Sequence, residues 1–194
     1  MNLPRLVLAS GSRYRAELLQ RLGLAFETRS PAVDETPREN EAPHELAVRL
    51  SMDKARHVAT TCDNALVIGS DQVAELDGKP VGKPGDMATA RMQLCAASGR
   101  ILTFHTALCL LDGRDGREYR VLDTTRVHFR PLVESEIDRY LEREQPLDCA
   151  GSFKCEGLGI SLFSRIESND PTALVGLPLI ALARLLRGCG AAIP

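Results

Sequence analysis

The chain has 194 residues, of which 44% are hydrophobic and 26% are charged, a composition typical of a globular protein with a sizeable core. Its formal net charge of −2, together with three Tyr, five Phe and no Trp, argues against a nucleic-acid-binding protein and against general attraction to an anionic membrane. The length suits one domain, or two small lobes that share a cleft. A site for an anionic ligand therefore has to be built locally.

The cysteines and the N-terminal segment both favour the cytosol. The six cysteines form no Cys-x-x-Cys pair and no Cys/His cluster with zinc spacing, so we expect no disulfide framework. The first apolar run contains Arg5 and is too short for a signal peptide or a bilayer-spanning helix. The sequence therefore predicts a cytosolic protein that does not enter a membrane.

The first part of the chain alternates short apolar strands with helices. Strands are predicted over 6–9, 26–29 and 65–69, and helices over 12–22 and 43–61. Ser12 suits the N-cap of the first helix, and Gly23 suits its end. The segment before the second helix is rich in Pro, Asp and Glu and is predicted to be a loop. The strand over 65–69 is predicted to stop at Ser70-Asp71.

The rest of the chain is richer in strands. Asp77-Gly78 is typical of a hairpin turn, and Asp86 suits the cap of a helix that runs to about Ser98. Further strands are predicted over 101–111, 119–129, 157–160 and 162–166, a helix over 134–144, and a last helix that opens at Pro178. We therefore predict an α/β chain with mixed strand directions and no linker.

The first candidate site is the turn from the strand at 6–9 into the next helix. Ser10, Ser12, Arg13 and Arg15 lie at or near this helix start, where free backbone N–H groups favour an anion. Two hydroxyls and two guanidinium groups there suit a phosphate. The same residues also fit an ordinary capped surface helix with solvated arginines.

Two acidic segments offer carboxylates. Asp34 and Glu35 lie in the loop before the second helix, where paired carboxylates suit Mg²⁺ or Mn²⁺, although a solvated loop is the favoured interpretation of this segment taken alone. Asp71 follows a buried strand, the place where open α/β sheets bind ligands, and its alternative role is a turn residue.

Two lysines are candidate phosphate ligands. Lys54 lies on the apolar stripe of its helix, four residues from both Leu50 and Val58, so it either meets an anionic partner or extends its ammonium to solvent at the edge of the stripe. Lys83 follows the predicted hairpin and precedes Pro84, and alone it is an ordinary surface lysine.

The segment at 149–157 combines small residues with opposite charges. Its small residues allow close approach of a ligand to the backbone, and Lys154 and Glu156 carry the charges. Cys155 is a weak candidate nucleophile, because no histidine lies near it in sequence. The four scattered histidines are interpreted as packing or surface residues.

Taken together, these segments resemble the Maf-like nucleotide pyrophosphatases over nearly the whole chain, as one domain over 1–194. The order and spacing of the pieces carry the resemblance. The pieces are Leu8-Ala9-Ser10 with Ser12 and Arg15, Val33-Asp34-Glu35-Thr36, Lys54-Ala55, Gly69-Ser70-Asp71-Gln72, Gly82-Lys83-Pro84, Gly99, Ala150-Gly151-Ser152-Phe153, Glu156-Gly157 and Val175-Gly176-Leu177-Pro178.

The resemblance implies an elongated mixed sheet with flanking helices and two lobes around a deep cleft. It implies hydrolysis of a nucleoside triphosphate to the monophosphate and diphosphate with a divalent cation, Mg²⁺ or Mn²⁺. Asp71 would be the proton acceptor, and Glu35 would hold the metal with it. The phosphate ligands would be Ser10, Arg15, Lys54 and Lys83. A homodimer is compatible with the resemblance.

Three positions favour the branch of the family that resembles 7-methyl-GTP pyrophosphatases: Tyr14, Gln72 and Glu156, where the pyrimidine-cleaving branch has Arg, Thr and Gln. A methylated purine carries positive charge, so the face of Tyr14 favours it by about 0.5–2 kcal/mol. Glu156 can accept hydrogen bonds from guanine N1–H and N2–H₂.

Two alternatives remain at this stage. One is a pyrophosphatase for other modified or pyrimidine nucleotides such as dTTP or UTP. The other is a nucleotide-binding regulator of septum formation that does not turn its ligand over. The joint presence of Glu35, Lys54, Asp71 and Lys83 favours an enzyme, because binding alone needs no base.

Overall fold

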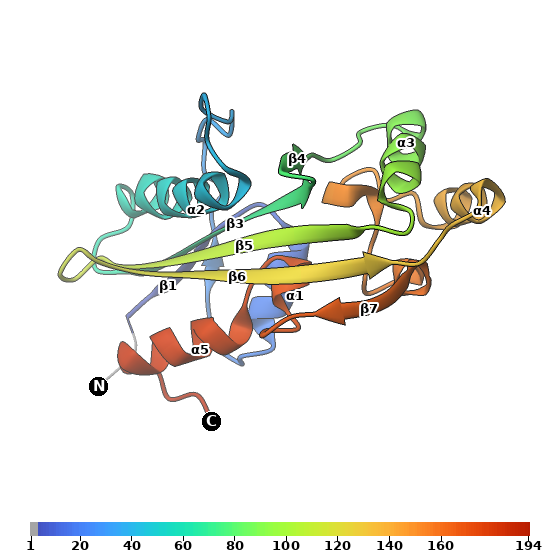
Figure 1. Ribbon diagram of the computed structural model, residues 1–194. Coiled ribbons are helices and arrows are strands. Elements are labelled where there is room, and N and C mark those ends of the chain that lie inside the picture. Colours follow the sequence, from blue (N-terminus) through green and yellow to red (C-terminus); the bar gives the residue numbers. More distant parts are fainter. Residues whose placement is uncertain (1–3) are drawn as a thin grey trace. The chain divides into compact units, whose positions relative to one another are not determined.

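A computed structural model describes residues 4–194, and within them seven strands form one sheet accompanied by five α-helices (Figure 1). The chain divides into two compact units. The first unit comprises the described residues up to Gln72, Thr106–Asp123 and Asp170–Pro194, and the second comprises Val73–His105 and Thr124–Asn169. Three long strands contribute residues to both units: β3 (Leu66–Leu76), β5 (Ile101–Asp112) and β6 (Arg117–Phe129).

In the first unit the strand order is β2-β1-β3-β5-β6. The central β1 (Leu6–Ala9) pairs in parallel with both β2 (Glu27–Thr28) and β3. Ala9 is aligned with Gly69 of β3. Because parallel strands in register point their carboxyl ends the same way, the chain leaves β1 at Ser10 beside Ser70 of β3. This edge of the sheet carries several of the predicted site residues.

Three strands of this unit, β1, β3 and β5, contribute apolar side chains to both faces of the sheet because helices cover both (Figure 1). Leu6 and Leu8 pack with α1 (Arg13–Gln20) and α5 (Leu179–Gly188), whereas the intervening Val7 and Ala9 pack with α2 (Pro43–Ala59). Alternation of side chains along a strand produces this division. The continuous apolar run of β1 is therefore explained by burial on two sides.

The second unit has its own core. β3 turns at Asp77-Gly78 into β4 (Lys79–Val81), and β7 (Phe163–Glu167) pairs antiparallel with β6. Its helices are α3 (Met87–Ala97) and α4 (Glu134–Glu144). A group of edge-to-face aromatic rings, with centroids 4.7–5.7 Å apart, fills its interior. The rings are those of Phe104, Phe129, Phe153 and Phe163.

The predicted helix starts are confirmed by their caps. The Ser12 hydroxyl accepts a hydrogen bond from the backbone N–H of Arg15, and the Asp86 carboxylate accepts one from that of Thr89. The first turn of α2 uses a different device, because the Glu45 carboxylate accepts from the backbone N–H of Ala42. Pro178 is the N-cap residue of α5 and not its first helical residue, so the helix begins one residue later than predicted.

Three predicted elements need correction. β3 does not stop at Ser70-Asp71 but continues to Leu76, so Asp71 lies inside a strand. The segment at 157–160 is not a strand: a 3-10 helix covers Leu158–Leu162, because the chain folds back until a Cβ on Gly159 would lie 2.4 Å from the Lys154 carbonyl oxygen. The strand predicted over 26–29 is shorter than expected, because β2 comprises only Glu27–Thr28.

The α/β class, the mixed sheet and the flanking helices are confirmed, while the cleft between two lobes and the single domain stay predictions. All six cysteines lie within the described residues and are free thiols. In the described part of the chain, none of the helices combines the length and the apolar character needed to cross a membrane.

Candidate active site

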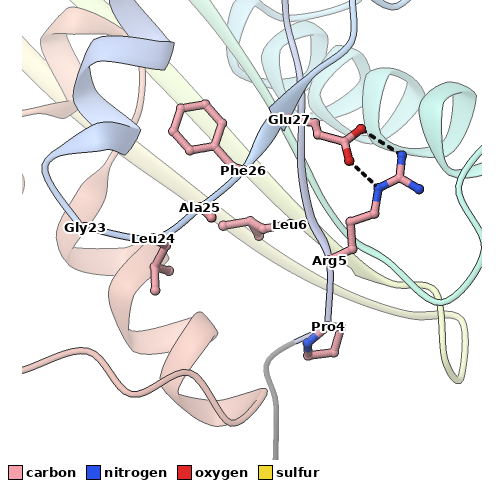
Figure 2. A pocket seen from close by; sticks show the side chains of 8 residues that line it. All are labelled: Pro4, Arg5, Leu6, Gly23, Leu24, Ala25, Phe26 and Glu27. Atoms are coloured by element: carbon pink, nitrogen blue, oxygen red, sulfur yellow. Dashed lines mark hydrogen bonds and ion pairs between the residues drawn. The ribbon is translucent and has the colours of Figure 1, made fainter.

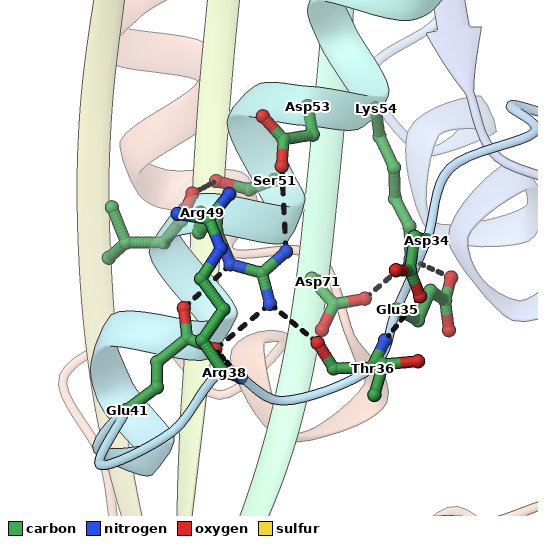
Figure 3. A network of polar contacts seen from close by, with 11 residues as sticks. Asp34, Glu35, Thr36, Arg38, Glu41, Arg49, Ser51, Asp53, Lys54 and Asp71 are labelled. Atoms are coloured by element: carbon green, nitrogen blue, oxygen red, sulfur yellow. Dashed lines mark hydrogen bonds and ion pairs between the residues drawn. The ribbon is translucent and has the colours of Figure 1, made fainter.

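The centre of the candidate site is a lysine between two carboxylates (Figure 3). The Lys54 Nζ atom lies 2.6 Å from Asp71 Oδ1 and 2.6 Å from Glu35 Oε1. These residues come from α2, from β3 and from the loop before α2. The structure therefore brings together, within the first unit, three candidate residues that lie in separate segments of the sequence.

Gly69 allows this contact. A Cβ at Gly69 would lie 2.0 Å from the carbonyl oxygen of Ser51 and 2.8 Å from the backbone nitrogen of Ala55. Only a residue without a side chain lets the backbones of β3 and α2 approach so closely. Lys54 precedes Ala55 on the helix and Asp71 follows Gly69 by two residues on the strand, so the close approach places the two side chains together.

Lys54 is buried rather than extended to solvent at the edge of its helix. It is 6% exposed and Asp71 is 7% exposed, whereas 60% of the Glu35 side chain is exposed. A buried ammonium needs an anionic partner, and the Asp71 carboxylate provides it. Of the two interpretations that the sequence left open for Lys54, the structure supports the ammonium that meets an anionic partner and not the ammonium extended to solvent.

Burial and charge act on Asp71 in opposite directions. Removal from water raises the pKa of the Asp71 carboxyl above its ordinary value, and the nearby Lys54 and Arg15 cations partly offset this effect. A carboxylate with a raised pKa is a better proton acceptor than a fully solvated one. The position of Asp71 is therefore suited to a general base.

Arg15 lies in the same unit and is held by two contacts. Its Nε donates to the carbonyl oxygen of Gly176 at 2.9 Å, and its Nη1 donates to the Ser10 hydroxyl at 3.3 Å. Burial lowers the pKa of the guanidinium, and the charges of Asp71 and Glu35 oppose that shift. An arginine side chain stays charged in proteins despite such a shift, so Arg15 brings a fixed positive charge to this edge of the sheet.

Ser70 and Gly176 were part of the recognised motifs, but no role was predicted for either residue. The Ser70 hydroxyl is shared between the carbonyl oxygens of Ala107 and Gly176, at 2.8 and 2.9 Å. The Gly176 carbonyl thus joins β3 to the guanidinium of Arg15. The signal that could have found this link is the Val-Gly-Leu-Pro segment, since a glycine is favoured at the φ of 120° found there.

A second missed contact fixes the acidic loop. The Arg49 guanidinium of α2 donates to both oxygens of the Glu41 carboxylate, at 2.6 and 2.9 Å, and to the carbonyl oxygen of Thr36 at 3.0 Å (Figure 3). The side chains of Arg49 and Glu41 are largely buried. Thr36 directly follows Glu35, so this bidentate pair holds the loop that presents Glu35.

Two of the predicted base-recognition residues lie in the first unit. The Arg13 guanidinium lies over the Tyr14 ring, 4.8 Å from its centroid, so the aromatic face already accepts a cation. The Gln72 amide nitrogen contacts the Thr106 hydroxyl and the carbonyl oxygens of Ala173 and Leu174, at 2.9–3.0 Å. Gln72 thereby fixes the segment that leads to Gly176.

Lys83 and Glu156 belong to the second unit, and both are exposed. The Glu156 carboxylate accepts a hydrogen bond from the Cys155 thiol at 3.1 Å. Burial raises the pKa of that thiol to about 12, which disfavours the thiolate and makes Cys155 a poor nucleophile. The roles of Lys83 and Glu156 in the same site as Asp71 stay predictions.

The residues present fit a metal that is held jointly with a substrate. In the described part of the chain, no three or more His, Cys, Asp or Glu side chains gather into a complete ligand set. Two carboxylate oxygens, from Glu35 and Asp71, nevertheless converge on the Lys54 ammonium. Mg²⁺ commonly takes one or two carboxylates and completes its shell with water and substrate phosphates.

A cavity of about 460 Å³ near the start of β1 does not fit an anionic substrate (Figure 2). It is lined by Pro4, Arg5, Leu6, Gly23, Leu24, Ala25, Phe26 and Glu27. Arg5, the one cation among the described residues that line it, is already paired with Glu27 at 2.7 Å. Ser10 and Asp71 do not line this cavity, so the chemistry is assigned to the lysine–carboxylate cluster instead.

Comparison with known proteins identifies similar chains over the full length. A family model described as "Maf-like protein" matches residues 5–189. A protein of Xanthomonas oryzae pv. oryzae (strain MAFF 311018) is 59% identical over 192 residues, which cover 99% of this chain and 100% of that protein. Proteins of Cupriavidus pinatubonensis and Ralstonia nicotianae are 56% and 58% identical, covering 97% and 95% of this chain and 94% and 95% of their own lengths. All three are named 7-methyl-GTP pyrophosphatase.

Proposed function

Because the chain belongs to the Maf-like protein family, we propose that it hydrolyses 7-methyl-GTP at the bond between the α and β phosphates, releasing 7-methyl-GMP and diphosphate. Full-length similarity to proteins named for this reaction supports the proposal. The structural observation that carries it is the contact of the buried Asp71 carboxylate with the buried Lys54 ammonium. A dense anion needs clustered cations, and hydrolysis needs a base.

Each residue of the cluster has a task in this reaction. Asp71 accepts the proton of the attacking water, whose oxygen forms a bond to the α phosphorus as the bond to diphosphate breaks. Lys54 and Arg15 offset the negative charge that grows on the phosphate oxygens. The Ser10 hydroxyl accepts hydrogen bonds from Arg15 and from the backbone of Ser12, and its O–H donates a hydrogen bond to a phosphate oxygen. Lys83 supplies a further cation.

Glu35 and Asp71 would hold a divalent cation, Mg²⁺ or Mn²⁺, together with the triphosphate. A bound divalent ion polarises phosphoryl oxygens and lowers the pKa of coordinated water. Lys54 would then share with this cation the two carboxylates that it contacts at 2.6 Å. The ammonium keeps these like charges close together before a ligand binds, because it offsets their mutual repulsion.

Base selection is assigned to Tyr14, Glu156 and Gln72. Tyr14 presents a ring face that already carries a guanidinium, and a methylated guanine can occupy such a position as a flat cation. Glu156 accepts hydrogen bonds from the base edge and counters the ring charge. Gln72 acts through the backbone at Ala173 and Leu174, since its amide nitrogen is engaged there.

The reaction takes place in the cytosol on free nucleotide and requires neither nucleic acid nor a membrane, and a homodimer is compatible with it.

Two alternatives differ in outcome. A broader pyrophosphatase would cleave dTTP or UTP, and a non-catalytic regulator of septum formation would bind nucleotide without releasing diphosphate. The buried pairing of Asp71 with Lys54 favours the enzyme, because a binding protein has no use for a desolvated base.

The test is diphosphate release from 7-methyl-GTP, GTP, dTTP and UTP with Mg²⁺ or Mn²⁺, comparing the wild type with Tyr14→Arg. We expect the wild type to prefer 7-methyl-GTP over the other nucleotides. Tyr14→Arg should lower this preference by about tenfold or more, because a fixed cation replaces the ring face. Preference for dTTP or UTP would overturn the base assignment and keep the reaction. Nucleotide binding without diphosphate release would favour the regulator.

A further inference from the structure

The segment that carries Glu156 is fixed to helix α4 on both sides of that residue, entirely within the second unit. On one side the backbone N–H of Lys154 donates to the Tyr140 hydroxyl at 3.1 Å. On the other side the backbone N–H of Leu158 donates to Glu144 Oε2 at 2.8 Å. Tyr140 and Glu144 both belong to α4, so one rigid element holds both ends of the short segment.

Glu144 is also engaged by the lysine of the segment. The Lys154 Nζ atom donates to the backbone carbonyl oxygen of Glu144 at 3.1 Å and lies 4.0 Å from its Oε1. About one fifth of each side chain is exposed, 19% for Lys154 and 21% for Glu144. The contacts therefore form partly out of water, where a hydrogen bond to a carboxylate contributes more than at the surface.

The sequence next to Glu156 is adapted to this carboxylate. A Cβ on Gly157 would lie 2.8 Å from both carboxylate oxygens of Glu144. Glycine at this position therefore lets the carboxylate cover the backbone directly after Glu156. The Glu156-Gly157 pair was recognised as a motif, and this contact gives its glycine a physical reason.

The position of Glu144 on its helix is unfavourable for helix stability alone. It is the last residue of α4, where the helix dipole disfavours an acidic side chain. The contacts to Leu158 and Lys154 offset that cost. An acidic residue at the negative end of a helix, facing a loop with a functional residue, is better explained by the loop than by the helix.

We propose that Glu144 is a positioning residue for base selection: its carboxylate fixes the backbone around Glu156 and thereby the direction from which Glu156 meets the base. The proposal rests on the assignment of Glu156 to base recognition. It adds a residue that does not touch the substrate. Loss of Glu144 lets the segment relax and weakens discrimination between bases, while the phosphate chemistry at Asp71 in the other unit continues.

The test compares Glu144→Ala, Glu144→Gln and the matched control Glu142→Ala on the exposed face of the same helix. The readout is the ratio of kcat/KM for 7-methyl-GTP to that for GTP. Glu144→Ala is expected to lower this ratio by about tenfold, mainly through KM for 7-methyl-GTP. Glu144→Gln keeps an oxygen acceptor for the Leu158 N–H and should retain most of the ratio, and Glu142→Ala should match the wild type.

A merely structural role would lower the activity on both nucleotides equally and leave the ratio unchanged, and that result would overturn the proposal. Gly157→Ala perturbs the same contact from the other side, so its effect on the ratio should shrink in the Glu144→Ala background. Fully additive effects would also contradict a shared contact. If the wild type prefers another nucleotide, the 7-methyl-GTP assignment fails, and the same ratio is taken for the preferred nucleotide against GTP. A lower ratio in Glu144→Ala than in the wild type then still supports the positioning role of Glu144, and an unchanged ratio refutes that role.

Discussion

Substitution of Gly69 by alanine tests how closely the catalytic cluster depends on helix–strand packing. The added Cβ would lie 2.0 Å from the Ser51 carbonyl oxygen and 2.8 Å from the Ala55 nitrogen, both backbone atoms that cannot rotate away. Ordinary contact needs more than 3.4 Å, so α2 has to move outward by an amount on the order of 1 Å. Overpacking of this kind costs about 1–3 kcal/mol of unfolding free energy.

The same displacement carries Lys54 away from Asp71. A misplacement of about 1 Å lowers catalytic rates by about a hundredfold, so Gly69→Ala should lose about that factor in kcat/KM for 7-methyl-GTP. Urea unfolding and diphosphate release measure the two effects. Gly188→Ala is the matched control, because a Cβ there has no atom of another described segment within 4 Å and alanine is favoured in a helix. Wild-type activity in folded Gly69→Ala would refute the argument that this packing sets the cluster.

Four further outcomes follow from the same contacts. Lys54→Met should stay folded and lose about 10²–10³ in kcat/KM, measured by diphosphate release, and unchanged turnover would contradict its role. Arg49→Ala removes the ion pair of the Glu41 carboxylate, which keeps the hydrogen bond from the Arg38 backbone N–H, and should lower the unfolding free energy by about 2 kcal/mol in urea titrations. Arg49 lowers the pKa of Glu41 from 4.5 to about 2, so this pair stabilises the fold above pH 4.5 and the contribution is lost as pH falls towards 2. In Glu41→Gln the unfolding free energy should not show this loss as pH falls. The same pH dependence of unfolding free energy as in the wild type would count against the pairing. Burial raises the pKa of Asp71 above 3.8, so in metal-free protein stability should fall as pH rises through the raised value, and Asp71→Asn should not show this fall.

Local patterns predicted most of the secondary structure and part of the site. The period of α2 placed Lys54 on the buried face, and the burial of a cation implied an anionic partner. The Ser12 and Asp86 caps followed from residue type and position. These features depend on neighbours in sequence, which is why a single chain reveals them.

Contacts between distant segments were not predictable in the same way. The Arg49–Glu41 pair looks like two solvated charges in the sequence, and only the return of the loop onto α2 buries them. The link from Ser70 through Gly176 to Arg15 spans most of the chain. The segment at 157–160 has a strand-like composition, but the packing of Gly159 against Lys154 makes it a 3-10 helix. Tertiary contacts decide such segments.

The most direct test of the central claim is the hydrolysis of 7-methyl-GTP in oxygen-18 water with Mg²⁺, comparing the wild type with Asp71→Asn. We expect metal-dependent formation of diphosphate, with the heavy oxygen in 7-methyl-GMP, because the water attacks the α phosphorus. We also expect Asp71→Asn, though folded, to lose about 10²–10⁴-fold in rate. Heavy oxygen in the diphosphate, or full activity of Asp71→Asn, would contradict that claim.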